Sequence, residues 1–233
     1  MTQYQVTVTM TAATFGGLTA SGCALYVFRA VRSADRAGRP VLWRRVPYST
    51  STHVGWRDGC QAYTSGSPIT GGEQVRVGFS AAIDVGQVLR VLPGGIGLVC
   101  SDGHAGAVAI LNTTSTMFTC GISGGTDSEP APYCAFPLYG NHLQTVVPLG
   151  KILLMFATRE VAPGTVVEHF YDAARTSFGP GVLIDLTGAT QRALTYDINT
   201  GWSWGGYTWA RTIPPGTDLV PLLIERPEAE PVR

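Results

Sequence analysis

Aromatic side chains gather in residues 201–209, where the sequence reads GWSWGGYTW. Three of the chain's five tryptophans lie in this stretch, interleaved with glycine, serine and threonine. An aromatic ring beside small residues can pack against the C–H face of a sugar while polar neighbours bind the sugar hydroxyls. The aromatic members are Trp202, Trp204, Tyr207 and Trp209, and the polar neighbours are Asp197, Asn199 and Arg211. The pattern predicts a non-enzymatic, lectin-like protein whose aromatic-lined cleft binds a carbohydrate or similar small ligand.

Two other interpretations of the same stretch stay open. Tryptophan prefers the boundary between apolar and wet surroundings, so these rings also suit a membrane surface, in a membrane-active or self-assembling protein. Alternatively, the tryptophans fill the core of a β-fold and donate their indole N–H groups to backbone carbonyls. Of these partners, we favour the small ligand over the membrane.

A second cluster indicates acid–base chemistry, which would make the protein a small β-fold enzyme acting on an apolar substrate. Its members are Glu168, His169, Tyr171 and Asp172. A carboxylate can serve as general base and a tyrosine as proton donor. Adjacent residues of a strand point to opposite faces, so Glu168 and His169 cannot both hold one metal ion. A metal site would instead combine His142 and His169 with a carboxylate, but we expect neither a metal nor another cofactor.

Two further patterns have structural interpretations that we favour over chemical ones. Residues 121–125 match G-x-S-x-G around Ser123, but Pro130 and Pro132 exclude the helix that follows a nucleophilic serine, which predicts a glycine-rich loop. Six arginines lie within residues 29–45: Arg29, Arg32, Arg36, Arg39, Arg44 and Arg45. Such a group can hold a phosphate, sulfate or carboxylate. Because the whole chain is neutral, we favour a solvated loop and charged edge strands.

Composition narrows the class of protein. Of the 233 residues, 45% are hydrophobic and only 14% are charged, with 29 glycines and 15 prolines. These values are typical of a loop-rich globular protein and argue against a coiled coil or a charged disordered chain. The net charge of zero argues against nucleic acid as a partner. Low charge and many strand edges favour a homo-oligomer.

The N-terminal residues and the cysteines indicate a location. Residues 1–10 alternate between apolar and polar side chains, which predicts a first strand rather than a signal peptide. The apolar runs are far shorter than the roughly 20 residues that span a bilayer. Five cysteines, an odd number without any C-x-x-C pair, favour reduced thiols over disulfides or zinc ligation. We therefore expect a cytoplasmic protein.

Short runs rich in valine, threonine and aromatic residues, each closed by turn residues, predict an all-β protein. We expect an antiparallel β-sandwich in one domain, residues 1–224, followed by a flexible tail, residues 225–233. Helical periodicity is thin throughout. The expected strands are 5–11, 23–31, 41–46, 53–56, 74–79, 88–92, 97–100, 107–112, 116–120, 145–147, 152–158, 166–171, 182–186, 192–197, 203–207 and 219–224.

An internal echo raises the alternative of a duplicated fold. Residues 72–82 and 164–174 share the pattern G-x-x-V-x-x-x-aromatic-x-A-A. A duplication would predict two similar sheet halves, residues 1–122 and 138–224, joined by a glycine- and proline-rich crossover at residues 123–137.

Overall fold

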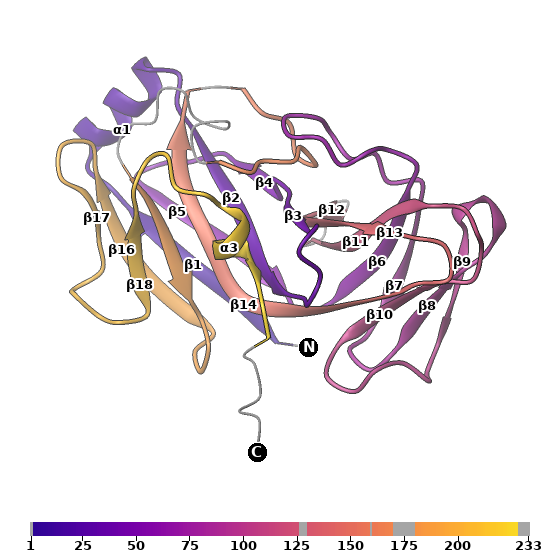
Figure 1. The fold of residues 1–233 in the computed structure, drawn as a ribbon. Coiled ribbons are helices and arrows are strands. Elements are labelled where there is room, and N and C mark those ends of the chain that lie inside the picture. The colour runs from indigo at the N-terminus through magenta and orange to yellow at the C-terminus, as the bar shows by residue number, and fades with distance from the viewer. Residues whose placement is uncertain (1, 126–129, 159, 170–179, 228–233) are drawn as a thin grey trace.

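The computed structural model describes residues 2–125, 130–158, 160–169 and 180–227. Strands dominate these ranges and form three hydrogen-bonded sheets around a shared apolar core (Figure 1). The predicted all-β class is confirmed, and the packing of one sheet face against another is that of a β-sandwich.

The first sheet has four strands in the order β17–β16–β1–β5. They are β17 (Gly201–Ser203), β16 (Gln191–Asp197), β1 (Gln3–Thr9) and β5 (Ser51–Arg57). The chain alternates with period two, so Val6 and Val8 of β1 and Val54 and Trp56 of β5 enter the core together. Because β1 pairs in parallel with β16, the first strand of the chain lies beside a strand from its last quarter.

The second sheet has nine strands and is organised around β14 (Leu143–Ala157). The path β18–β15–β14–β10–β8–β9 is made of β18 (Ala210–Ile213), β15 (Gly181–Asp185), β14, β10 (Val108–Asn112), β8 (Val88–Val91) and β9 (Gly97–Cys100). Off this path, β2 (Ala24–Arg32) pairs with β14, β4 (Arg44–Val46) and β19 (Ile224–Glu225). The pairing of β14 with β2 shifts register between Pro148 and Ile152. Figure 1 shows β14 bending along its length and reaching the strands beside β10.

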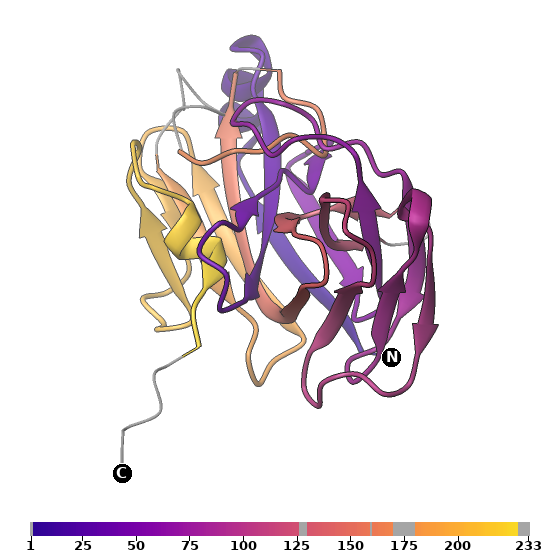
Figure 2. The same cartoon turned by 45° about the vertical axis from the view of Figure 1, so that its right-hand side comes forward.

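The third sheet has six strands. It contains β3 (Arg39–Pro40), β13 (Cys134–Leu138), β11 (Phe118–Gly124), β6 (Cys60–Ser65), β7 (Phe79–Ile83) and β12 (Ala131–Pro132). In Figure 2, the magenta strands of residues 80–112 and the orange-to-yellow strands of residues 181–225 lie at opposite sides of the molecule. The described strand pairs are antiparallel except β1–β16, β8–β10 and β2–β19.

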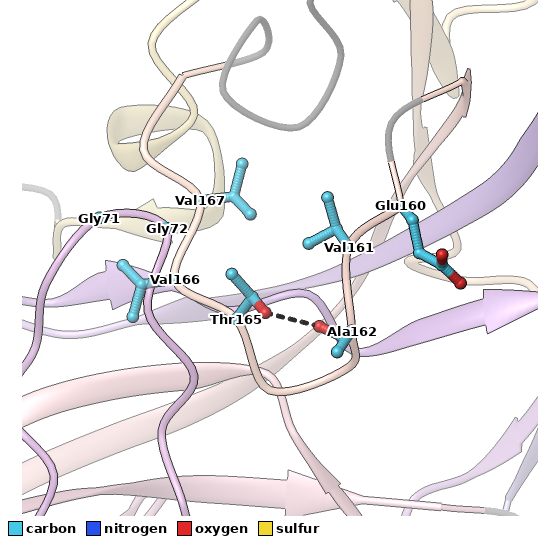
Figure 3. Close-up of a pocket in the computed structure, with 8 residues that line it drawn as sticks. All are labelled: Gly71, Gly72, Glu160, Val161, Ala162, Thr165, Val166 and Val167. Atoms are coloured by element: carbon cyan, nitrogen blue, oxygen red, sulfur yellow. Dashed lines mark hydrogen bonds between the residues drawn. The ribbon is translucent and has the colours of Figure 1, made fainter.

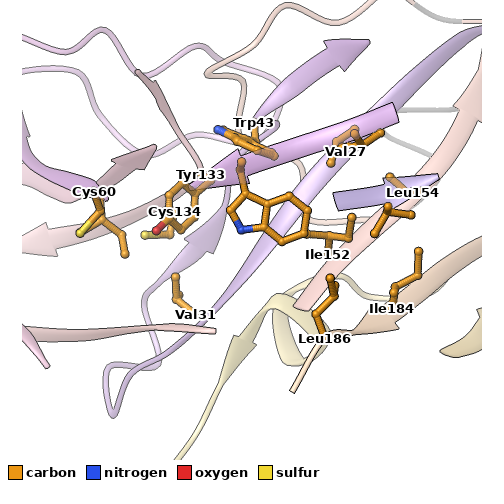
Figure 4. Close-up of a cluster of buried hydrophobic side chains, with 14 of the residues drawn as sticks. Val27, Val31, Trp43, Cys60, Tyr133, Cys134, Ile152, Leu154, Ile184 and Leu186 are labelled. Atoms are coloured by element: carbon orange, nitrogen blue, oxygen red, sulfur yellow. The ribbon is translucent and has the colours of Figure 1, made fainter. Parts of the chain in front are cut away.

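One core cluster connects all three sheets. Strand β2 contributes to it because Leu25, Val27 and Val31 point to one face, while Tyr26 and Phe28 point into a second, smaller cluster. Figure 4 shows the rings of Trp43 and Tyr133 among the aliphatic side chains of the larger cluster.

The structure contains helical turns that periodicity did not reveal. Helix α1 (Ala12–Ala20) begins where the side chain of Thr11 accepts a hydrogen bond from the backbone N–H of Thr14. A 3-10 turn, η1, covers Pro93–Gly95, and α3 covers Val220–Leu223, inside an expected strand. None of the helices in the described ranges is long and apolar enough to cross a bilayer.

The expected crossover, duplication and tail can each be compared with the observed strands. The expected crossover, residues 123–137, contains β12 and most of β13, which are strands of the third sheet. The first residues of the two echoed stretches lie side by side, since Gln74 forms an antiparallel bridge with Thr165. The first two sheets each combine strands from both proposed halves, and the duplication stays a prediction. Glu225, the first residue of the expected tail, lies in β19.

Candidate functional site

The structure places Trp202 in the core. This residue of β17 is 8% exposed, and its ring stacks on Phe156 of β14 with centroids 5.6 Å apart. Its indole N–H donates to the backbone carbonyl of Pro180 at 2.7 Å. Trp202 therefore satisfies its polar atom internally and presents little surface to a ligand.

The other three aromatic residues of the predicted cleft, Trp204, Tyr207 and Trp209, form a surface group that we call the aromatic platform. Tyr207 is 65% exposed, and its ring lies nearly parallel to that of Trp209, with centroids 6.4 Å apart and an interplanar angle of 18°. Trp204 is half-buried and donates its indole N–H to the carbonyl of Tyr207 at 2.7 Å. The hydrogen bond from Trp204 therefore holds the backbone of Tyr207 in place, while the ring of Tyr207 is open to solvent.

Two glycines shape the turn that carries the platform. Gly205 and Gly206 have φ values of 74° and 73°, in the left-handed region that side chains disfavour. A Cβ atom at Gly205 would lie 3.0 Å from the ring of Tyr207. Glycine at this position thus lets the Tyr207 ring fold back over the turn.

The three polar residues of the predicted site differ in their contacts and exposure. The carboxylate of Asp197 accepts from the backbone N–H groups of Asn199 and Thr200 and from the hydroxyl of Thr14. These bonds, that to Asn199 first, lower the pKa of Asp197, so the carboxylate is ionised and holds the turn between β16 and β17. Asn199 and Arg211 are exposed. The guanidinium of Arg192, which the sequence analysis did not single out, lies 5.0 Å from the ring centroid of Trp209.

The predicted acid–base cluster is only partly described. Glu168 forms an ion pair with Arg39, and its backbone carbonyl accepts from Leu219. His169 forms an isolated backbone bridge with Asp218. Tyr171 and Asp172 lie outside the described residues.

The alternative metal ligands lie in different elements. His142 is exposed in the turn between β13 and β14, where its ring makes an edge contact with Tyr139. His169 follows the segment that bridges to Val41 and Gln74. Within the described ranges, no group of three or more His, Cys, Asp or Glu side chains could hold a metal ion.

A pocket of about 370 Å³ lies beside the acid–base segment (Figure 3). Gly71, Gly72 and residues 160–162 and 165–167 line it, and Figure 3 shows the hydroxyl of Thr165 directed at Ala162. That hydroxyl donates to the Ala162 carbonyl at 2.8 Å, and the carboxylate of Glu160 pairs with Arg45. The polar side chains of this pocket already have partners, so it offers little for catalysis.

Ser123, the middle residue of the G-x-S-x-G match, is 1% exposed and lies within strand β11. The expectation of a glycine-rich loop is therefore wrong for residues 121–124, because all four lie in β11 and pair with β6 or β12. A serine inside a paired strand lacks the exposed turn that a nucleophile requires.

The expectation of a solvated loop and charged edge strands is wrong for Arg29, which is a buried cation. Arg29 of β2 is 3% exposed and is surrounded by the rings of Trp43, Trp56 and Tyr133. The sequence held one signal of this burial. Side chains alternate along a strand, so Arg29 lies on the same face as Leu25, Val27 and Val31. An arginine at an inward position of an apolar strand calls for a specific reason.

Comparison with protein-family models, with curated proteins and with solved structures finds no match to this chain. Functional inference therefore rests on the geometry of these sites.

Proposed function

We propose that the protein is a non-enzymatic, lectin-like binding protein whose aromatic platform holds a carbohydrate or a small ligand of similar chemistry. The observation that carries this proposal is the exposed ring of Tyr207, held parallel to Trp209. A sugar presents a C–H face that packs against such a ring.

Preorganisation supports the proposal. The bond from Trp204 to the Tyr207 carbonyl and the turn at Gly205 and Gly206 fix the platform before a ligand arrives. A rigid surface loses less conformational entropy on binding than a flexible one. Arg192 beside Trp209, and Arg211 two residues beyond it, supply N–H donors for hydroxyl groups.

Self-association and a cytoplasmic location belong to the same proposal. Strand β9 is the last strand of its sheet path, and Leu98 on it is 62% exposed. An apolar edge strand can pair with a second copy of the chain. The five cysteines are all free thiols, four of them buried, which is the state that a reducing compartment maintains.

The test is a glycan array probed with the wild-type protein, Tyr207→Ala and the control Tyr139→Ala. Tyr139 is a suitable control because it is 50% exposed and lies in a different part of the fold, beside His142. We expect sugar binding by the wild type and by Tyr139→Ala. Loss of the ring in Tyr207→Ala should weaken binding about tenfold.

The outcomes separate the competing functions. Equal sugar binding by Tyr207→Ala and the wild type would show that the sugar does not bind at the aromatic platform. Liposome binding that depends on Tyr207, without any sugar signal, would instead support a membrane-active protein. Circular dichroism of each variant shows whether it has kept the fold.

A further inference from the structure

Arg29 is a buried cation in the middle of strand β2. It shares the inward face of the strand with Val27 and Val31 and is 3% exposed. Moving a guanidinium out of water is costly unless hydrogen bonds and an opposite charge compensate. The groups around Arg29 therefore decide whether it serves the fold or a ligand.

Three aromatic rings surround the guanidinium. Its central carbon lies 4.4 Å from the ring centroid of Tyr133, 5.2 Å from that of Trp43 and 5.7 Å from that of Trp56. Ring faces attract a cation, but they do not replace hydrogen-bond acceptors for its N–H groups. Within the described ranges, Nε and Nη1 of Arg29 are buried without a hydrogen-bond partner, and so is the hydroxyl of Tyr133.

Arg29 takes part in none of the ion pairs found among the described residues. Those pairs use Arg32, Arg39, Arg45, Arg90 and Lys151. A second guanidinium, that of Arg44, lies 4.2 Å from the centroid of the same Trp43 ring. Burial, and then the charge of Arg29, lower the pKa of Arg44. A second cation thus shares the Trp43 ring with Arg29.

A cavity of about 580 Å³ lies next to this group, and we call it the Gly124 cavity. Its lining includes Cys60, Gln61, Ile83, Gln87, Ser123 and Gly124, and the exposed Arg57 and Asp84 also line it. Its size matches that of small-molecule sites. The thiol of Cys60 donates to the carbonyl of Ile83, and burial raises the pKa of this thiol to about 11. Cys60 therefore stays uncharged at neutral pH and adds no negative charge beside Arg29, while the carboxylates of Asp84 and Asp58 act on the same thiol.

Gly124 lines the cavity and also lies against the guanidinium of Arg29. A Cβ atom at this position would lie 2.6 Å from Nη1 of Arg29 and 3.3 Å from the ring of Tyr133. The carbonyl of Gly124 also accepts from the indole N–H of Trp43 at 2.7 Å. The absence of a side chain thus brings the cavity wall directly against an unpartnered N–H donor.

We propose that the Gly124 cavity binds a small organic acid, whose carboxylate enters past Gly124 and accepts hydrogen bonds from Arg29 and Tyr133. Charge-assisted bonds to a guanidinium are among the strongest that a buried site can offer. The unpartnered Nε, Nη1 and phenolic hydroxyl are the donors that such a carboxylate would satisfy. This site lies among β2, β6 and β11, apart from the aromatic platform on the β17–β18 segment, so it does not depend on the proposed function.

The experiment uses sodium acetate and sodium succinate as probes, with sodium chloride at matched ionic strength as the reference. Thermal unfolding and titration calorimetry are recorded for the wild-type protein and for Arg29→Met, Gly124→Ala and the control Arg90→Met. Arg90 is exposed, pairs with Asp102 and is not among the residues that line the cavity, so its removal changes the net charge equally without removing a lining residue.

We expect either probe to raise the melting temperature of the wild type and of Arg90→Met above the chloride reference. Arg29→Met should bind at least about tenfold more weakly, because it lacks the charged donor. Arg29→Met should also keep its fold without ligand, since it removes a buried charge that lacks a counter-ion. Gly124→Ala retains Arg29 but should lose binding, because its methyl group blocks the approach.

Three results would overturn the proposal. They are no response of the wild type to either probe, an unchanged response in Arg29→Met, and an unchanged response in a folded Gly124→Ala protein. If Arg29→Met does not fold, Tyr133→Phe takes its place, because it removes only the hydroxyl. The first of these results, combined with a response to sodium phosphate as a third probe, would reject an organic acid in favour of an inorganic anion.

Discussion

The guanidinium carbon of Arg29 lies 4.4 Å from the centre of the Tyr133 ring, in the interior of the protein. Burial raises the pKa of Tyr133, and this effect outweighs the opposing influence of Arg29. The phenol therefore remains neutral beside a permanent cation. A neutral ring attracts the guanidinium through its face but cannot balance its charge.

The tryptophan-rich segment should separate into structural and exposed residues when each ring is removed. We predict that Trp202→Ala lowers the free energy of unfolding by about 3–5 kcal/mol, because it empties a site against Phe156 in the core. Tyr207→Ala, at an exposed position, should lower it by less than about 1 kcal/mol. Urea unfolding monitored by circular dichroism measures both values. Similar losses in the two variants would contradict this division of roles.

Alkaline pH should destabilise the fold through Cys60. Burial raises the pKa of its thiol from 9.0 to about 11, so the folded state holds the proton more tightly than the unfolded state. The resulting stability is fully present below pH 9.0 and is lost as the pH rises through about 11. We predict that Cys60→Ala reduces this alkaline loss by on the order of 2–3 kcal/mol.

Urea unfolding at a series of pH values from neutral to strongly alkaline measures the effect of Cys60. The slope of stability against pH is compared, because removing the thiol also changes packing. Cys100→Ala is the matched control, since Cys100 is half-buried and free. It should keep the wild-type slope. An unchanged slope in Cys60→Ala would show that other groups cause the alkaline loss.

Edge pairing should control self-association. Ile96 and Leu98, at 55% and 62% exposure, lie before and on the edge strand β9. We predict that Leu98→Glu shifts the protein toward the monomer, because a charge on an edge strand disfavours pairing with a second copy. Light scattering after size exclusion measures the mass of each species. Met117→Glu changes a residue of 56% exposure outside the described strands and should leave the mass unchanged. A monomeric wild type would remove the basis for this prediction.

Local patterns predicted the strands that alternate or consist of short apolar runs. The expected strand at 192–197 matches β16, and that at 88–92 matches β8, since period-two alternation and branched side chains act within one segment. The local patterns failed at Val220–Leu223, where apolar residues form α3 with a proline in its first turn. They also failed at 74–79, where Gln74 makes only an isolated bridge and the strand starts at Phe79.

Helix α1 and strand β13 escaped prediction for related reasons. The helix contains two adjacent glycines, which weaken helical propensity, and its stability comes from the Thr11 cap and from packing of Leu18 in the core. Strand β13 contains Pro137, which on sequence grounds argues against a strand. Neither segment is stable alone, so only its tertiary neighbours decide its structure.

By itself, the sequence determined the all-β class and the presence of an unusual aromatic segment, because both follow from residue types and short-range spacing. Only the tertiary structure decided that Trp202 is buried while Tyr207 is exposed. The reason is that Trp202 meets Phe156 from β14, more than forty residues earlier in the chain. Arg29 meets Trp43, Trp56 and Tyr133 in the same way. Burial and partnership depend on which distant segments pack together, and spacing along one strand cannot encode that choice.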